Sequence, residues 1–105
     1  MTSYVVYEVT CCVCKESYIG STSLPLHTRA KEHIAAAKKK SDTTRVGEHY
    51  RKHHPTVEPH PHFQIIRRTG RDELRLRIEE AIAIQEAHPT MNRHREEFGV
   101  EFLAN

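Results

Sequence analysis

The most reactive residues of this sequence are three cysteines, which crowd the stretch CCVCKESYIG between Cys11 and Gly20. Cys11 and Cys14 have the C-x-x-C spacing with which a turn presents two thiolates to one Zn²⁺ ion, whereas Cys12 follows Cys11 directly and is expected to point elsewhere. Because all three lie within four positions, they cannot form a disulfide framework across a fold. They indicate thiolates in a reducing compartment.

Histidines further along the chain can complete such a site. His49 with His53 or with His54 gives H-x₃-H or H-x₄-H spacing, so a Cys₂His₂ zinc site is feasible. The alternative is that the thiols bind nothing and are tolerated at the tip of a hairpin.

Arg29 and His33 are a second pair of residues whose side chains could take part in a reaction. They stand four residues apart in a helical stretch, so both side chains project from one face. An arginine there can bind a phosphate with two hydrogen bonds, and a histidine can move a proton. The alternative is an ordinary polar helix face.

Adjacent acids at Glu79 and Glu80 differ in their surroundings on a predicted helix. At about 100° per residue Glu79 falls on a charged face, whereas Glu80 falls beside Leu76 and Ile84. A carboxylate at the border of an apolar stripe needs a cation, a metal or hydrogen bonds to compensate its lost solvation. Glu80 is therefore the candidate functional acid, with a structural salt bridge to an arginine as the alternative, and Glu79 is expected to be solvated.

The elements that must position these residues can be predicted from propensity and periodicity. Strands are predicted over residues 4–9, 17–21 and 63–68, and helices within residues 23–40, 43–54 and 71–88. The apolar stripe of the first helix is predicted at Leu26, Ala30, Ile34 and Ala37. The order ββααβα predicts a small α+β domain with a three-stranded antiparallel central sheet flanked by helices.

Composition sets limits on the class of protein. The 105 residues indicate a single domain spanning residues 1–105, with 37% hydrophobic residues and a formal net charge of only +2. No apolar run reaches the length of a membrane span and the N-terminus lacks a signal-peptide pattern, so we expect an intracellular protein without membrane contact. Positive charge is concentrated locally at residues 38–40 and 67–71, in runs that are commonly solvated helix ends or loops.

Four segments, taken together and in order, resemble the GIY-YIG nuclease family over nearly the whole chain. They are VVY at Val5 to Tyr7, YIG at Tyr18 to Gly20, LHTRAKEH around Arg29 and His33, and EAIAIQEAHPTMN from Glu80 to Asn92. The first motif departs from the family because Val5 and Val6 replace Gly and Ile. Its tyrosine is kept, so we expect altered packing more than altered chemistry.

The resemblance implies a metal-dependent endonuclease that cuts phosphodiester bonds in DNA. Position by position it places Tyr7, Tyr18, Arg29 and Glu80 around the scissile phosphate and one Mg²⁺ or Mn²⁺ ion held by Glu80, with His33 in the same hydrogen-bond network. Arg29 is implied to stabilise the transition state, and Tyr7 to act on the attacking water; which group takes the proton stays open. The implied contacts to DNA or phosphate are Gly20, Ser21, Arg29, Lys38 and Asn92.

The cysteines make the sequence resemble one group of domains within this family. GIY-YIG domains of Penelope-like retroelements carry cysteines between the two motifs and histidines after the first helix, and this sequence is similar to those. The similarity implies a structural zinc on Cys11, Cys14, His49 and His54, with His54 preferred over His53.

Such a domain would cleave the target site of a mobile element, in the nucleus if the source is eukaryotic, within a larger polyprotein. The alternative is a catalytically inactive, zinc-stabilised module that binds nucleic acid or protein. Nicking or double-strand cutting, DNA specificity and oligomeric state stay open.

Overall fold

The chain forms three strands and three helices in the computed structural model, which describes residues 3–41 and 43–92. The elements are β1 (Val5–Thr10), β2 (Ser17–Thr22), α1 (Leu26–Lys39), α2 (Arg45–His53), β3 (His62–Arg68) and α3 (Glu73–Ala87). The predicted α+β class and the order ββααβα are confirmed. Among the described residues, no helix combines the length and the apolar character needed to cross a bilayer.

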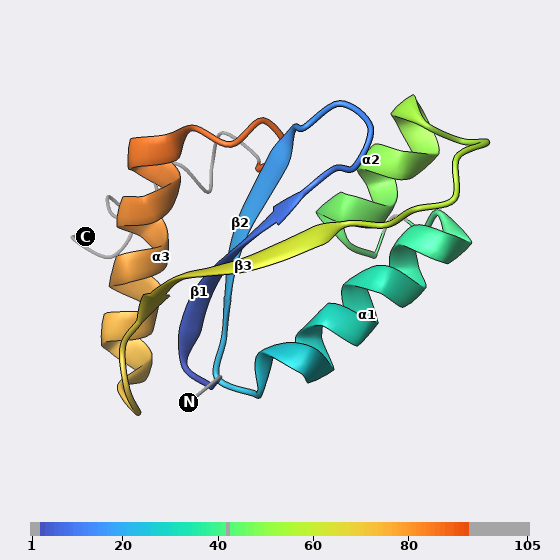
Figure 1. The fold of residues 1–105 in the computed structure, drawn as a ribbon. Helices are drawn as coiled ribbons and strands as arrows, with labels where there is room; N and C mark the ends of the chain where they lie inside the picture. The colour runs from blue at the N-terminus through green and yellow to red at the C-terminus, as the bar shows by residue number, and fades with distance from the viewer. Residues whose placement is uncertain (1–2, 42, 93–105) are drawn as a thin grey trace.

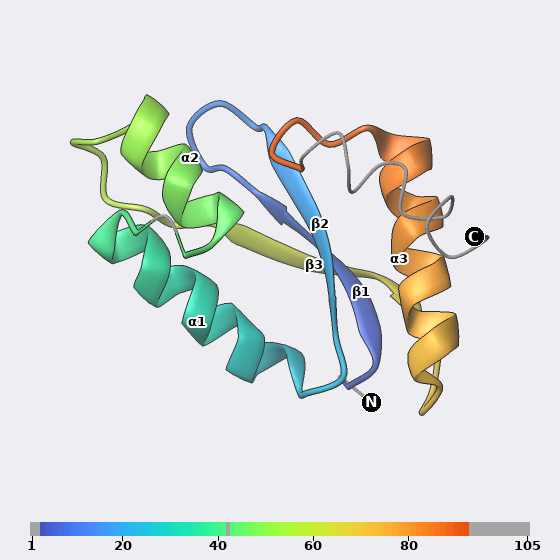
Figure 2. The same cartoon turned by 180° about the vertical axis from the view of Figure 1, so that it is seen from behind.

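The three strands form one antiparallel sheet in the order β2-β1-β3, so β1 lies at its centre. Helix α3 covers one face of this sheet, and α1 and α2 cover the other (Figure 1). The view from behind shows the same three layers, with β2 as the outer strand between α1 and α3 (Figure 2). A central strand covered on both faces must be apolar on both, which explains the run of buried residues in β1.

Alternation along β1 divides the core into two clusters. Tyr7, Val9 and Cys11 point to the side of α1 and α2, whereas Val6 points to α3, where it joins Ile19 of β2. Tyr7, on β1, and Cys11, directly after its end, therefore lie in the same core cluster. Tyr7 and Cys11 are four residues apart, or about 13 Å along the strand.

Local signals explain where the helices begin. Pro25 precedes α1, where its missing N–H costs nothing. The side chain of Thr44 accepts a hydrogen bond from the N–H of Gly47 to cap α2, and that of Asp72 accepts from the N–H of Arg75 to cap α3. Observed boundaries lie within three residues of the predicted ones, as expected for ends set by caps and sheet pairing.

The predicted apolar stripe of α1 is wrong in detail. Of its members only Ala37 is fully buried, and the other buried residues of α1 are His33 and Ala36. The helix turns His33 toward the sheet because a tyrosine hydroxyl there provides it with a hydrogen bond.

Gly47 is required where α1 turns into α2. A Cβ at this position would lie 2.1 Å from the carbonyl oxygen of Ser41 and 3.1 Å from that of Ala36. Both neighbours are backbone atoms, which cannot move aside without shifting the helices.

We therefore expect Gly47→Ala to lower the free energy of unfolding by about 2 kcal/mol or more, although alanine is the better helix former. Urea denaturation measures the loss. The control is Gly70→Ala, where no atom lies within 4 Å and only the positive φ of 70° opposes the substitution, at about 1 kcal/mol. Equal losses in the two variants would show that the close contact at Gly47 is unimportant.

Candidate active site and metal centre

The first cluster is centred on the hydroxyl of Tyr7, on β1. Its oxygen lies 2.8 Å from Nε2 of His33, which reaches it from α1, and both side chains are only 1% exposed. The ring of Tyr18, on β2, lies 5.8 Å from that of His33. The structure thus brings together three of the predicted catalytic residues from three elements.

Gly20 leaves space for this arrangement. It is paired with Tyr7 in the register of β1 and β2, and a Cβ at Gly20 would lie 2.8 Å from the Tyr7 hydroxyl and 2.8 Å from the Tyr18 ring. The glycine is needed here because the Tyr7 side chain crosses directly over it. Predicted as a phosphate contact, Gly20 also has this steric role.

Charged groups also affect the pKa of Tyr7. Burial raises the pKa of Tyr7; the nearby Arg29 guanidinium opposes this, and the carboxylates of Glu80 and Glu32 add to it. Arg29 itself is held by Glu32, whose Oε1 lies 2.6 Å from the guanidinium. The sequence interpretation missed Glu32, although its position three residues after Arg29 on a helix is a recognised spacing for an ion pair.

His33 is neutral in this environment. Burial, and then the positive charge of Arg29, lower its pKa to about 4. Its Nδ1 atom is buried without a hydrogen-bond partner among the described residues. The Tyr7–His33 hydrogen bond therefore joins two uncharged groups near neutral pH.

Glu80 lies on α3, which covers the other face of the sheet, and its link to Tyr7 is the charge that contributes to the raised pKa of the tyrosine. The side chain of Ser21, on β2, donates a 2.6 Å hydrogen bond to Oε1 of Glu80, on α3. Glu80 is half-buried, whereas its neighbour Glu79 forms a 3.5 Å ion pair with Arg67. The expectation that Glu79 is merely solvated is therefore wrong, because β3 provides it with a cation.

Two further predicted contacts lie apart from the Tyr7 hydroxyl. Asn92 is buried, and its side-chain amide binds the backbone of Ile19: Oδ1 accepts from the N–H at 2.8 Å and Nδ2 donates to the carbonyl at 2.9 Å. Asn92 thus supports the strand that carries Tyr18 and Gly20. Lys38 is exposed near the end of α1, nine residues or roughly 13 Å of helix beyond Arg29.

The second cluster lies at the other end of the same hairpin and consists of Cys11, Cys14, His49 and His54. One ligand atom from each lies within 4.8 Å of all the others. Around a tetrahedral zinc ion such atoms are roughly 3.3–3.8 Å apart, so a small contraction would bring the four into bonding geometry. His53 is not a member of this group, although its ring lies 5.0 Å from that of His49.

The atoms of this cluster suit a metal ion. Nε2 of His54 is buried and has no hydrogen-bond partner among the described residues, and Sγ of Cys14 lies 3.3 Å from Nε2 of His49. Burial lowers the pKa of His49, so its imidazole is neutral and can offer a lone pair. Soft thiolates with imidazoles form a donor set that Zn²⁺ prefers.

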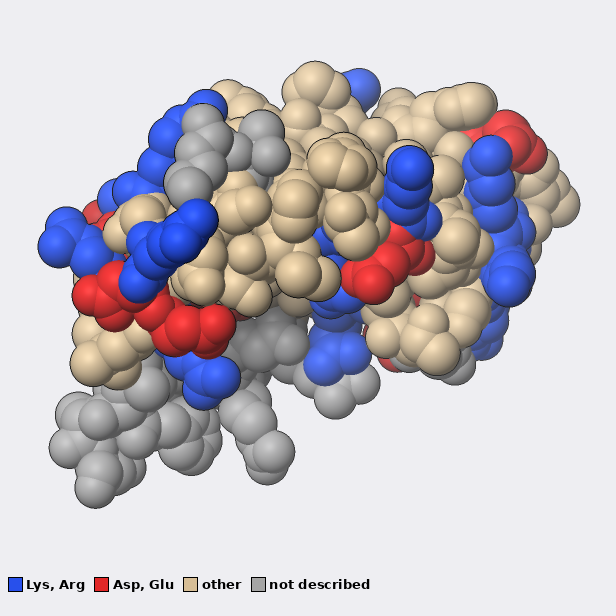
Figure 3. All heavy atoms as spheres, turned by 90° about the horizontal axis from the view of Figure 1, so that it is seen from below, with Lys and Arg blue, Asp and Glu red and all other residues tan. Residues whose placement is uncertain are grey.

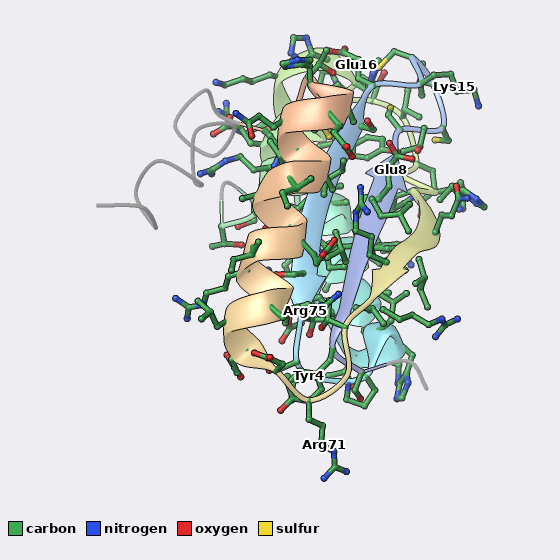
Figure 4. All side chains as sticks on the ribbon, turned by 90° about the vertical axis from the view of Figure 1, so that its left-hand side faces the viewer. Tyr4, Glu8, Lys15, Glu16, Arg71 and Arg75 are labelled. Carbon is green, nitrogen blue, oxygen red and sulfur yellow. The ribbon has the colours of Figure 1, made fainter. Side chains whose placement is uncertain are left out.

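Two residues that the sequence interpretation overlooked support the cluster. The hydroxyl of Tyr50, a fully buried residue of α2, lies 3.3 Å from the backbone N of Cys12 and 3.4 Å from its Sγ, which ties α2 to the hairpin. Glu16 accepts a 3.3 Å hydrogen bond from Cys14. Figure 4 shows Glu16 with Lys15 at this end of the sheet, far from Tyr4 and Arg71 at the other.

Comparison with known proteins does not assign this chain to a family. No family model, curated protein or solved structure matches the chain. Its function must be inferred from its own residues and their geometry.

The neutral, buried His33 predicts a pH dependence of stability. Because its pKa is lower in the folded chain than the unfolded value of 6.5, the unfolded state binds more protons between pH 6.5 and pH 4. Neutral His33 therefore contributes to the free energy of unfolding, fully above pH 6.5. This contribution decreases by about 3 kcal/mol as the pH falls to 4. Urea denaturation at pH 7.5 and 4.5 should show this loss in the wild type.

The variant His33→Gln, which keeps a polar group toward Tyr7 but does not titrate, isolates this contribution. Between the two pH values, the variant should lose less stability than the wild type, and the difference should be close to the contribution of about 3 kcal/mol from His33. An identical pH dependence in both proteins would contradict the assignment.

Proposed function

We propose that this chain is a metal-dependent DNA endonuclease. The observation that carries the proposal is the buried Tyr7 hydroxyl, hydrogen-bonded to His33 and acted on by the charges of Arg29 and Glu80. A tyrosine that only stabilised a core would not need both a histidine on its hydroxyl and a cation acting on it. Hydrolysis of a phosphate diester does need groups that position water and stabilise added negative charge.

Each residue has a distinct task in this proposal. Arg29, half-buried at the start of α1, binds the scissile phosphate and stabilises the negative charge of its transition state. Tyr7 and His33 orient the attacking water, and the ring of Tyr18 lies beside that of His33. Burial raises the pKa of Tyr7, so a base role for this hydroxyl requires further positive charge beside it.

Glu80 is the residue that would hold the catalytic cation. Its carboxylate is a hard oxygen donor, of the kind that Mg²⁺ and Mn²⁺ prefer, and its charge already acts on Tyr7. A bound cation of this type supplies charge neutralisation at the phosphate and the leaving oxygen. The motif resemblance adds to this proposal, since it selects the same residues independently of their geometry.

The distribution of surface charge suits contacts with DNA at separate basic groups more than binding through one broad basic face. On the face seen in Figure 3, Lys and Arg side chains lie in separate groups on the α3 side and the α1 side, with acidic residues among them. Lys38 belongs to the lysines that end α1 and would contact backbone phosphates beyond the cleaved bond.

We also propose that the cluster of two cysteines and two histidines binds a structural zinc ion. Cys11 and Cys14 belong to the hairpin, and His49 and His54 lie at α2, so one ion would join two elements that are distant in sequence. A domain of 105 residues has a small core and gains most from such a link.

Nuclease activity can be tested with a supercoiled plasmid and Mg²⁺ or Mn²⁺. We expect relaxation or linearisation by the wild type and a loss of about a hundredfold or more in rate for Glu80→Gln, because the substitution removes the cation's charged ligand. Glu79→Gln is the matched control: it lies next to Glu80 on α3 but pairs with Arg67, and it should retain activity.

Intact plasmid under all metal conditions would favour the second candidate function, a zinc-stabilised binding module without catalysis. The ion pair between Arg29 and Glu32 is the observation that favours this second function, because the guanidinium already has a carboxylate partner. Gel-shift measurements with the same DNA would then decide between a nucleic-acid-binding and a protein-binding module.

For zinc, we expect about one equivalent of the metal in the purified protein and a lower melting temperature after chelation, because folding and metal binding are linked. His54→Ala should lose the metal, whereas His53→Ala, one residue earlier, should keep it. Zinc retained by His54→Ala, or a melting temperature unaffected by chelation, would contradict the assignment.

A further inference from the structure

The two cysteines of the proposed zinc centre differ sharply in exposure. Cys11 is only 1% exposed and belongs to the core cluster on the side of α1 and α2. Cys14 is exposed, and so are its neighbours Val13 and Lys15. Figure 4 shows Lys15 at the outer end of the hairpin. A small oxidant in solution can therefore reach the sulfur of Cys14 but not that of Cys11.

The turn between β1 and β2 holds the same two cysteines close together. The backbone N–H of Cys11 donates to the carbonyl of Glu16 at 2.8 Å, and the N–H of Lys15 donates to the carbonyl of Cys11 at 3.2 Å. The Sγ atoms of Cys11 and Cys14 lie within 4.8 Å of each other. A disulfide needs the sulfurs roughly 2 Å apart, so the exposed side chain of Cys14 must turn toward Cys11 while the turn itself keeps its backbone bonds.

Cys12, the third cysteine, is directed elsewhere. Its Sγ atom lies 3.4 Å from the hydroxyl of Tyr50, and its backbone N lies 3.3 Å from the same oxygen. Because Tyr50 is fully buried in α2, it fixes the direction of the Cys12 side chain. Cys12 is also outside the group of four residues that could share a metal ion. We therefore expect Cys12 to stay a free thiol.

We propose that Cys14 is a site of reversible oxidation by hydrogen peroxide, that Cys11 converts it to a disulfide, and that this reaction expels the zinc ion. The Cys14 thiolate attacks peroxide, so that an S–O bond forms, the O–O bond breaks and hydroxide leaves. The Cys11 thiolate then attacks Sγ of the Cys14 sulfenic acid, so that the S–S bond forms, the S–O bond breaks and a second hydroxide leaves. The two thiolates lose two electrons in total, and these reduce one peroxide to two hydroxide ions.

The disulfide would remove the soft donors from the proposed zinc centre. Only His49 and His54 would remain, and both belong to the α2 side of the site. A metal held by these two imidazoles alone no longer joins α2 to the hairpin and has lost the thiolates that favour Zn²⁺. Peroxide would thus control how firmly α2 is attached. The inference rests on the proposed zinc centre and does not require nuclease activity.

The test is to treat the zinc-loaded full chain with hydrogen peroxide and to follow zinc release with a chromogenic chelator. Free thiols are then alkylated and located by fragmentation in a mass spectrometer. We expect about one zinc ion released for each disulfide formed, with Cys11 and Cys14 protected and Cys12 alkylated. Dithiothreitol with added Zn²⁺ should restore the starting protein. Cys12→Ser is the matched control and should release zinc and form the disulfide as the wild type does.

The order of the two steps is tested on the same wild-type protein. Dimedone, added together with the peroxide, traps the first sulfenic acid as a stable adduct. We expect this adduct on Cys14, because its sulfur is the exposed one. An adduct found first on Cys11 or Cys12 would contradict the assignment.

Failure of the inference and failure of the zinc centre give different results. If the purified protein contains zinc and keeps it after peroxide treatment, or if the disulfide includes Cys12, the inference is wrong and the zinc centre stands. If the purified protein contains no zinc, the zinc centre is rejected, and the proposed release of zinc is rejected with it. Cleavage of plasmid DNA by the untreated protein bears on the nuclease proposal alone.

Discussion

The burial of Val5, Val6, Tyr7 and Val9 in the central strand β1 is the constraint on which the rest of the structure depends. Helices cover both faces of the sheet at these residues, so a polar group among them must find a partner inside the protein. Tyr7 meets this requirement through His33, and Cys11, the buried residue that follows β1, lies in the group that could share a metal ion. The need to satisfy these groups draws α1 and α2 onto the same face, and both candidate centres follow from it.

One strand therefore couples two kinds of chemistry. The side chains of Tyr7, Val9 and Cys11 belong to a single packed cluster, which Tyr50 and Val46 of α2 complete. Movement of α2 away from the hairpin would open the packing on which the position of the Tyr7 hydroxyl depends. We therefore expect a loss of order at the proposed zinc centre to cause a loss of order at the proposed active site.

Much of the fold could be predicted from sequence because its signals are local. Alternation and β-branched residues mark β1, prolines mark the loop before β3, and the spacing of cysteines and histidines indicates the group that could hold a metal. The predicted stripe of α1 omitted His33 because periodicity treats histidine as polar and exposed. His33 is instead buried, and its hydrogen-bond partner Tyr7 lies 26 positions away in the chain. The bonds of Glu80 to Ser21 and of Glu79 to Arg67 also depend on the sheet register, which no local pattern reveals.

The pairing of Asn92 with Ile19 also bears on how the sheet ends. An outer strand exposes a row of N–H and C=O groups on which another chain can build a new strand, and proteins avoid aggregation by covering that row. Here the side-chain amide of Asn92 takes the place of a neighbouring peptide group, and the N–H of Met91 donates to the carbonyl of Ser17 at 3.0 Å. The residue that closes the last motif thus protects β2, the outer strand that carries Tyr18 and Gly20, against unwanted strand addition.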